Sequence, residues 1–350
     1  MKKLAVIGCG SIGEYHLNHF IQFKDIQLVG FCDLLIERAE KFVKKSGCGK
    51  AFSDFFKMYD EVTPDMVFIC VPPTCHGIIE FESIRRSIHF FVEKPLSLDM
   101  GLAKEVIRQL EDTGLIAASG FQCRYDSINE AAKNFIKTTK ILHVSGSRIG
   151  GMVEVPWWRV KASSGGQLVE QTIHQMDILR YLLEDEPDTV FSVANRGYLD
   201  QKEFPGYFTD DMSTTLIVFK SGLTATMVTG CYALSSSCWD NKITFGGRET
   251  RMDYRLITDL TVYREDNETR EEQEGVISGD GMIRTSGGTG TTIKTNNDPG
   301  IECDRTFIDA VISGDASKIR SPYTDAWKSV AFCLACNKSM DTGMPVKVEY

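Results

Sequence analysis

Leu4-Ala5-Val6-Ile7-Gly8-Cys9-Gly10-Ser11-Ile12-Gly13 is the stretch that decides the fold of this chain. An apolar run of strand length ends in Gly-x-Gly-x-x-Gly, and a sequence that favours a helix follows at once. In a dinucleotide site each glycine has its own role: Gly8 permits a tight turn, Gly10 lets the backbone approach a pyrophosphate, and Gly13 allows close helix–strand packing. A helix that begins near Ser11 and Ile12 directs its unpaired N–H groups at the phosphates.

A carboxylate follows at the distance that a dinucleotide site requires. The second apolar run, 26–32, ends in Asp33, twenty positions after Gly13. A carboxylate at this place hydrogen-bonds the ribose hydroxyls of the adenosine. The alternative is a structural glycine turn with Asp33 capping the next helix, but strand, turn, helix, strand and Asp all occur in register. Asp33 would also repel a 2′-phosphate, so the predicted cofactor is NAD rather than NADP.

Length and composition indicate an ordinary globular chain of two domains. Its 350 residues exceed what one core usually supports, and it is 42% hydrophobic and 25% charged. The formal charge of −9 argues against a nucleic-acid partner, and no apolar run reaches the ~20 residues of a membrane span. We expect no signal peptide, because Met1-Lys2-Lys3 leads into a short strand only. The eleven cysteines are scattered, which indicates reduced thiols and a cytoplasmic location.

The first domain, residues 1–121, alternates between strand and helix patterns. Apolar runs at 66–71 and 89–92 indicate buried strands, and helices are expected over 77–86 and 102–111. This alternation predicts an α/β fold with a doubly wound parallel sheet of the Rossmann type. Ligands bind at the carboxyl ends of such strands. In this chain the ends carry Asp33, Val71–His76, Glu93–Pro95 and Gly120–Arg124.

The second domain, residues 122–350, is predicted to be α+β with a largely antiparallel open sheet. Strand patterns separated by short turns occupy 141–148, 189–197, 212–220, 223–232, 241–245, 251–254 and 260–264. The polar, glycine-rich stretch 265–300 is expected to be a surface loop. Helices are expected over 127–137, 167–183, 306–313 and 325–340, the last of them packing back near the first domain.

Two sites carry side chains suited to chemistry. Lys94 follows a strand at the ligand-binding edge, where its ammonium can donate to a substrate oxygen, although a lysine alone is more often a solvated surface residue. Glu170, His174 and Asp177 have helical spacing that predicts one shared face, so that Glu170 would orient His174 as a general base. A buried structural histidine is the alternative. No other histidine completes a zinc pattern, so we predict no metal.

Further candidates lie in two loops. The turn Val71-Pro72-Pro73-Thr74-Cys75-His76 offers backbone N–H groups and Thr74 to a ribose, with His76 as a ribose neighbour or a packing residue. Trp157, Trp158 and Arg159 follow one another, and exposed tryptophans are uncommon unless they meet a ligand. Core packing of one tryptophan is the alternative interpretation.

Together these residues resemble the glucose–fructose oxidoreductase/inositol dehydrogenase/MocA-like family over nearly the whole chain. The resemblance is carried by these segments: Gly8–Gly13, Val71–His76, Glu93-Lys94-Pro95, Gly120–Tyr125, Gly165–Asp177 and Ser321-Pro322-Tyr323. It implies hydride transfer between NAD and a secondary alcohol of a sugar, polyol or glycoside. It also implies a homo-oligomer, a dimer or tetramer, formed through the open sheet.

The resemblance assigns residues to roles. Lys94 and His174 match the catalytic lysine and histidine, and Glu170 stands where the family usually has Asp. Trp158 and Arg159 resemble a pair near the nicotinamide, and Tyr232 matches a substrate position. The expected cofactor contacts are Gly8, Gly10, Ser11, Ile12, Gly13, Asp33, Val71, Pro72, Thr74, His76, Glu93, Lys94, Gln122, Trp158 and Arg159. The expected substrate contacts are Lys94, Gln122, Trp157, His174 and Tyr232.

Two other functions use the same residues. An NAD-recycling enzyme could cleave a glycoside through a transient keto-sugar, and a sensor could bind NAD or a sugar without catalysis. Cofactor retained through purification, with turnover in the absence of added NAD, distinguishes the first. The presence of both Lys94 and His174 argues against the second.

Overall fold

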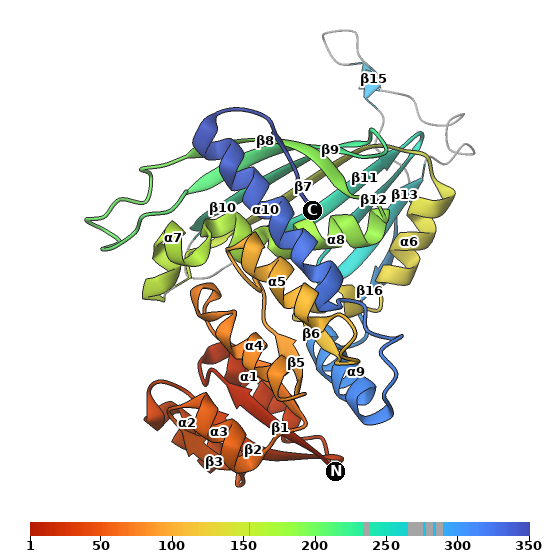
Figure 1. Cartoon of the computed structure of the whole chain (residues 1–350). Coiled ribbons are helices and arrows are strands. Elements are labelled where there is room, and N and C mark those ends of the chain that lie inside the picture. The colour runs from red at the N-terminus through yellow and green to blue at the C-terminus, as the bar shows by residue number, and fades with distance from the viewer. Residues whose placement is uncertain (154, 234–237, 265–275, 278–282, 285–289) are drawn as a thin grey trace.

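The computed structural model describes residues 1–153, 155–233, 238–264, 276–277, 283–284 and 290–350, and its chain folds into two large sheets (Figure 1). The N-terminal sheet has six parallel strands in the order β3-β2-β1-β4-β5-β6. Their bounds are β1 Lys2–Ile7, β2 Ile26–Cys32, β3 Lys50–Phe52, β4 Met66–Ile69, β5 His89–Val92 and β6 Ala117–Ser119. This order confirms the predicted Rossmann-type sheet.

The helices of this part follow the strands as the sequence predicts, with one addition. Their bounds are α1 Ser11–Phe20, α2 Ile36–Ser46, α3 Phe55–Val62, η1 Pro73–Cys75, α4 Ile78–Arg85 and α5 Met100–Leu110. Helix α3 has no counterpart among the predicted elements. Asp54 caps it, because its side chain accepts hydrogen bonds from the backbone N–H groups of Phe56 and Lys57.

The C-terminal sheet has nine described strands in the order β16-β13-β12-β11-β7-β10-β9-β8-β17. Their bounds are β7 Ile141–Gly151, β8 Pro187–Asn195, β9 Met212–Phe219, β10 Thr224–Ala233, β11 Cys238–Gly247, β12 Thr250–Arg255, β13 Asp259–Arg264, β16 Gly290–Lys294 and β17 Val346–Lys347. All neighbours are antiparallel except β7 and β10. The predicted surface loop over 265–300 is wrong at its end, because β16 lies there and pairs with β13. Within the stretch, the two-residue strands β14 (Val276–Ile277) and β15 (Ile283–Arg284) pair with each other. The rest of 265–289 lies outside the described residues.

Helices cover one face of this sheet, as Figure 1 shows. They are α6 Asn129–Thr138, α8 Ile173–Leu183 and α10 Tyr323–Thr342. Alternate strand residues such as Val190 and Ile217 are completely buried beneath them. The residues between them face outward: Phe191 on β8 and Leu216 on β9 are cross-strand partners and are 37% and 44% exposed.

The C-terminal helices return to the N-terminal sheet. Helix α9 (Pro299–Ser313) packs against α1 through a buried contact between Asp304 and His16. Just before α10, Pro322 forms an isolated antiparallel bridge with Ala118 of β6, and Ser321 exchanges hydrogen bonds with Ser119. The edge of the first sheet is thereby attached to the second part of the chain.

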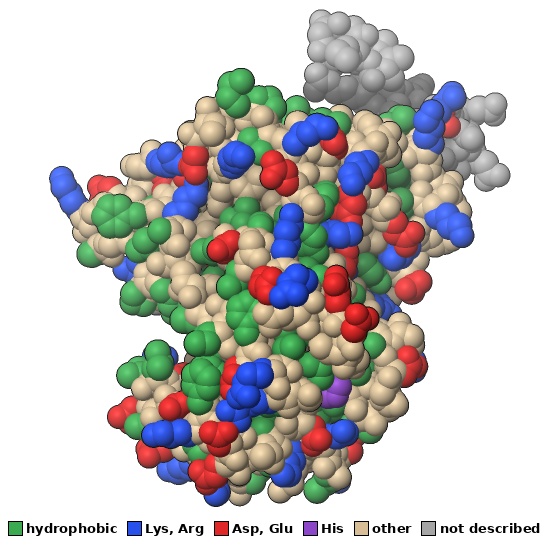
Figure 2. All heavy atoms as spheres, viewed as in Figure 1, with side chains coloured by type: hydrophobic (Ala, Val, Ile, Leu, Met, Phe, Trp, Pro, Cys, Tyr) green, Lys and Arg blue, Asp and Glu red, His purple; other side chains and the backbone are tan. Residues whose placement is uncertain are grey.

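The outer surface of both parts mixes acidic and basic side chains on the face that Figure 2 shows, with no single-sign patch. On the left of that view the surface is hollowed between the two parts. In the described residues, none of the helices is long and apolar enough to cross a membrane.

Candidate active site

The glycine-rich turn has the geometry of a dinucleotide site. Gly8 has a φ of +93°, and a Cβ there would overlap the carbonyl oxygen of Cys70. A Cβ on Gly13 would overlap the carbonyl oxygen of Gly8, so this glycine is needed for packing within the turn. A Cβ on Gly10 would meet no atom within 4 Å. The turn therefore leaves open space at Gly10, above the N-terminus of α1, where Ser11 and Ile12 are exposed.

Asp33 is held against this turn. Its Oδ2 accepts a hydrogen bond from the backbone N–H of Cys9 at 2.9 Å, and its Oδ1 accepts one from Leu35 at 3.0 Å. An ionised carboxylate has about four acceptor positions, so both oxygens keep capacity for ribose hydroxyls. These observations fit a bound NAD.

The loop after β4 adds a buried histidine. The Nδ1 of His76 lies 2.6 Å from Oε1 of Glu80. The Oε2 of Glu80 accepts a hydrogen bond from the backbone N–H of Gly77 at 2.6 Å. The Nε2 of His76 is buried and has no hydrogen-bond partner in the described structure. Thr74 is exposed, and Val71 and Pro72 are half-buried. The loop thus has polar groups for a ligand at the strand ends.

Lys94 forms an ion pair across the two parts of the chain. Its Nζ lies 2.9 Å from Oε1 of Glu170 and donates to the carbonyl oxygen of the same residue at 2.8 Å. The Nε1 of Trp158 donates to Oε2 of Glu170 at 2.8 Å, and Gln171 donates to the same oxygen. Trp158 is completely buried. Glu170 is therefore fixed by three neighbours and in turn fixes the ammonium of Lys94.

His174 lies beside this ion pair but is not bonded to Glu170. Of the contacts that the structure describes, the closest polar one joins its Nδ1 to the Sγ of Cys123 at 3.9 Å, and the ring of Phe121 is 6.4 Å away. The loss of water around the ring, together with the charges of Lys94 and Arg148, holds the pKa of His174 well below its ordinary value. The imidazole is therefore neutral at neutral pH, as a proton acceptor must be.

The predicted pairing of Glu170 with His174 is not found among the described contacts, because Glu170 binds Lys94, Trp158 and Gln171. Residues Leu168–Thr172 form a π-helix, η4, before α8 begins at Ile173. Glu170 therefore lies in the π-helical turn, whose hydrogen bonds run i→i+5, whereas His174 and Asp177 lie on α8. Asp177 binds Arg124, and the neighbouring Cys123 meets His174, so His174 and Asp177 face the same segment.

The remaining predicted residues lie around this group. Trp157 is half-buried beside Trp158, in the 3₁₀ turn η3 (Pro156–Arg159), and Arg159 donates to the carbonyl oxygen of Pro205 at 3.1 Å. Tyr232 packs against the hydrophobic cluster that contains Trp158. Gln122, in η2 (Gln122–Tyr125), accepts a hydrogen bond from the hydroxyl of Tyr15 at 3.1 Å.

Glu93 has partners that no sequence pattern pointed to. Its Oε1 lies 3.0 Å from Nε2 of His16, whose Nδ1 lies 2.9 Å from Asp304. The two carboxylates outweigh the cost of burial, although burial is the largest single influence, and raise the pKa of His16 to about 10. His19 joins the cluster, with its Nδ1 2.6 Å from Asp304. These nitrogen–oxygen distances are those of hydrogen bonds. The ligand atoms of His16, His19 and Asp304 are also close enough together to hold a metal ion. Sequence spacing gives no sign of Asp304 as a partner of His16, because it lies on α9, 288 positions further along the chain.

A parallel sheet with this turn, an anchored Asp33, and a lysine and neutral histidine at the strand ends define a dinucleotide-dependent oxidoreductase. Residues 2–121 match the family model described as "Oxidoreductase family, NAD-binding Rossmann fold", and residues 136–348 match its partner, "Oxidoreductase family, C-terminal alpha/beta domain". The chain belongs to the glucose–fructose oxidoreductase/inositol dehydrogenase/MocA family and is an NAD-binding oxidoreductase.

Curated relatives and a solved structure agree with this family. The chain is similar to myo-inositol 2-dehydrogenase of Thermotoga maritima, with 26% identity over 99% of this chain and 98% of that protein. It is 30% identical to scyllo-inositol 2-dehydrogenase (NAD(+)) of Bacillus subtilis over 63% of this chain and 64% of that one. The structure of levoglucosan dehydrogenase with NADH and levoglucosan superimposes with a TM-score of 0.81 over 100% of both chains, at 19% identity, which establishes a shared fold.

Proposed function

We propose that this protein oxidises a secondary alcohol of a sugar, polyol or glycoside with NAD, with His174 as the base and Lys94 as the oxyanion donor. The observation that carries the proposal is the charged ammonium of Lys94, held by Glu170, beside a histidine kept neutral. The names of the relatives, inositol dehydrogenases and a D-glucoside 3-dehydrogenase, support the substrate class.

The chain's own residues supply the proton chemistry. NAD, when bound, supplies the hydride acceptor. His174 takes the hydroxyl proton at Nε2, in the tautomer whose Nδ1–H points toward Sγ of Cys123. Lys94 donates a hydrogen bond to the oxygen as negative charge develops there. Glu170 keeps Nζ of Lys94 in place through the ion pair, and Trp158 holds Glu170 by donating to its other carboxylate oxygen.

The cofactor contacts follow from the same geometry. We propose that the open space at Gly10 receives the pyrophosphate, that Asp33 binds the adenosine ribose, and that the buried Nε2 of His76 faces the cofactor. Glu93, Gln122 and Arg159 remain candidates at the same edge. Trp157 and Tyr232 remain candidates for the substrate side.

A substrate panel tests this function. The purified protein is supplied with NAD and, separately, with free sugars, inositols and glycosides, and reduced nicotinamide is recorded by fluorescence. We expect a signal with at least one polyol-like compound, and its loss in Lys94→Ala but not in His143→Ala, an exposed histidine on β7. Tight NAD binding with no signal from any compound contradicts the proposal and favours a sensor. Glycoside cleavage without added NAD favours the recycling reaction.

We also propose two domains, residues 1–121 and 122–350, in a homo-oligomeric cytoplasmic protein. The outward-facing pair Phe191 and Leu216 gives the bare sheet face an apolar surface that a second copy would cover. The ten described cysteines are free, as expected for a reducing compartment. Light scattering of the purified chain tests the assembly: a dimer or tetramer supports it, and a monomer that persists at high concentration contradicts it.

A further inference from the structure

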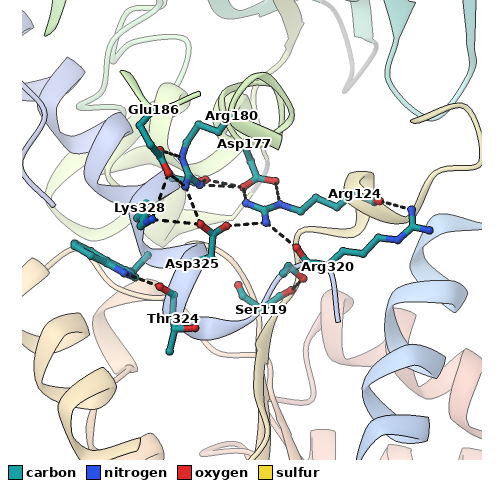
Figure 3. Close-up of polar contacts among 12 residues, drawn as sticks. Ser119, Arg124, Asp177, Arg180, Glu186, Arg320, Thr324, Asp325 and Lys328 are labelled. Atoms are coloured by element: carbon teal, nitrogen blue, oxygen red, sulfur yellow. Dashed lines mark hydrogen bonds and ion pairs between the residues drawn. The ribbon is translucent and has the colours of Figure 1, made fainter. Parts of the chain in front are cut away.

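An ionic cluster that includes Arg124, Asp177, Arg180 and Asp325 lies against α8 (Figure 3), the helix on which His174 also lies. The guanidinium of Arg124 donates to both carboxylate oxygens of Asp177, from Nε at 2.8 Å and from Nη2 at 2.6 Å. Its Nη1 lies 2.8 Å from Asp325 and donates to the carbonyl oxygen of Arg320 at 2.7 Å. Both side chains of the Arg124–Asp177 pair are almost completely buried.

This ion pair joins helix α8 to the segment that directly follows the NAD-binding sheet. Arg124 lies in η2, directly after the edge strand β6 of the NAD-binding sheet. Asp177 lies in α8, three residues after His174. The same η2 segment also meets His174 itself, through Sγ of Cys123. Helix α8 is therefore held by η2 at two points, one of them a fixed two-bond contact.

A buried ion pair of this kind fixes geometry more than it adds to stability. Burying two charges costs about as much as their attraction returns, so a buried ion pair is weak support for stability alone. Two parallel hydrogen bonds between guanidinium and carboxylate fix distance and orientation together. The sulfur–nitrogen approach of 3.9 Å between Cys123 of η2 and His174 of α8 is too weak to do this.

We propose that Arg124 and Asp177 are positioning residues that set the placement of His174 relative to the NAD-binding edge. The inference rests on the proposed role of His174 as the base. The ion pair fixes the rotation and height of α8 against η2. A displacement of about 1 Å at a reacting group can cost about 100-fold in rate, so a loosened α8 lowers the rate of hydride transfer more than it lowers NAD affinity.

The same cluster provides a matched control. Arg180 donates to both oxygens of Glu186, from Nε at 2.6 Å and from Nη2 at 2.8 Å. This second two-bond pair joins α8 to the turn that follows it, and Lys328 of α10 lies beside it. Glu186→Gln therefore removes one ionic partner from the same helix without touching η2.

Asp177→Asn, Arg124→Lys and Glu186→Gln are compared with the unchanged protein, each with saturating NAD and the best compound of the panel. The measurements are thermal stability, NAD affinity and the single-turnover rate of reduced nicotinamide formation. We expect Asp177→Asn and Arg124→Lys to slow the single turnover about 10-fold or more, with NAD affinity changed less than about 3-fold. Glu186→Gln should keep the rate within about 2-fold, and Asp177→Glu, which keeps the charge, should recover part of it.

Titration of His174 by NMR separates this inference from the proposed function, because it needs no turnover. In Arg124→Lys, which keeps the charge of the pair, the pKa of His174 should move toward its ordinary value as the ring gains water, and in Glu186→Gln it should not. Equal losses of rate in Asp177→Asn and Glu186→Gln at equal stability overturn the inference, as does an unmoved titration of His174. If the unchanged protein reduces no nicotinamide, the proposed function fails and the titration alone decides the positioning. Where Asp177→Asn does not fold, Arg124→Lys gives the same readouts.

Discussion

The ammonium of Lys94 and the carboxylate of Glu170 form an ion pair of 2.9 Å although 76 positions separate them in the chain. The pair connects the end of β5 in the NAD-binding sheet to the π-helix η4 that precedes α8. Glu170 therefore acts on Lys94, and His174 is left with Cys123 as its described polar neighbour.

Glu170→Gln should slow turnover about 100-fold, because the ammonium of Lys94 loses the charge that holds it in place. NAD affinity should change little. Steady-state kinetics and NAD titration measure the two effects. Glu184→Gln serves as the control, since it removes an exposed ion pair of equal length with Lys133 outside the site. Equal kinetics in the two variants would show that the Lys94–Glu170 pair has no role in turnover.

The glycines of the turn should separate folding from cofactor binding. Gly10→Ala should leave thermal stability unchanged and weaken NAD binding, because its Cβ meets only the open space left for the cofactor. Gly13→Ala should lower thermal stability, because its Cβ overlaps the Gly8 carbonyl oxygen. Calorimetry and NAD titration of both variants check this pair. Undiminished NAD affinity in Gly10→Ala would place the pyrophosphate elsewhere.

Alcohol oxidation should remain active at mildly acidic pH, and the pH profile of kcat/KM measures this. The base form of His174 exists above its pKa, and that pKa is lowered by lost hydration and by the charges of Lys94 and Arg148. The acid limb should therefore fall below the ordinary histidine value of about 6.5. Arg148→Gln should move the limb to higher pH. Lys242→Gln, whose ammonium lies beside Asp253, should not. A limb at or above the ordinary value would contradict the role of His174.

His16 should make stability depend on pH. Its pKa is raised to about 10 in the folded protein through Asp304 and Glu93, against the desolvation that lowers it. The stabilisation is complete below the unfolded pKa of about 6.5 and is lost as the pH rises through about 10. Thermal unfolding between these values should show a falling midpoint in the unchanged protein and a flatter line in His16→Gln. Parallel lines would mean that His16 is not protonated in the fold.

The N-terminal sheet and its glycine-rich turn could be predicted almost completely from the sequence. Its strands are continuous apolar runs, its turn carries three glycines with separate steric demands, and Asp33 stands at the required distance. These are local signals, so the sheet and its NAD site could be predicted. Helix α3 was missed, although Asp54 caps it and its apolar residues recur at helical spacing.

The contacts that complete the site are not local, and spacing could not reveal them. The predicted pairing of Glu170 with His174 is not among the described contacts, because Glu170 binds Lys94, which lies 76 positions earlier in the chain, and Trp158. Asp304 reaches His16 only because α9 returns to α1. Strand β16 was hidden in a polar stretch, since its five residues are all exposed and give no alternating pattern.

The most direct test of the central claim is a double-mutant cycle on Lys94 and His174. Single-turnover formation of reduced nicotinamide is measured for the unchanged protein, Lys94→Ala, His174→Ala and the double variant, with NAD affinity as the control. If both side chains act on one hydroxyl, each single change should cost about 100-fold or more, and the double variant should lose far less than the product of the two. Full activity in either single variant, or losses that simply multiply, would contradict the account.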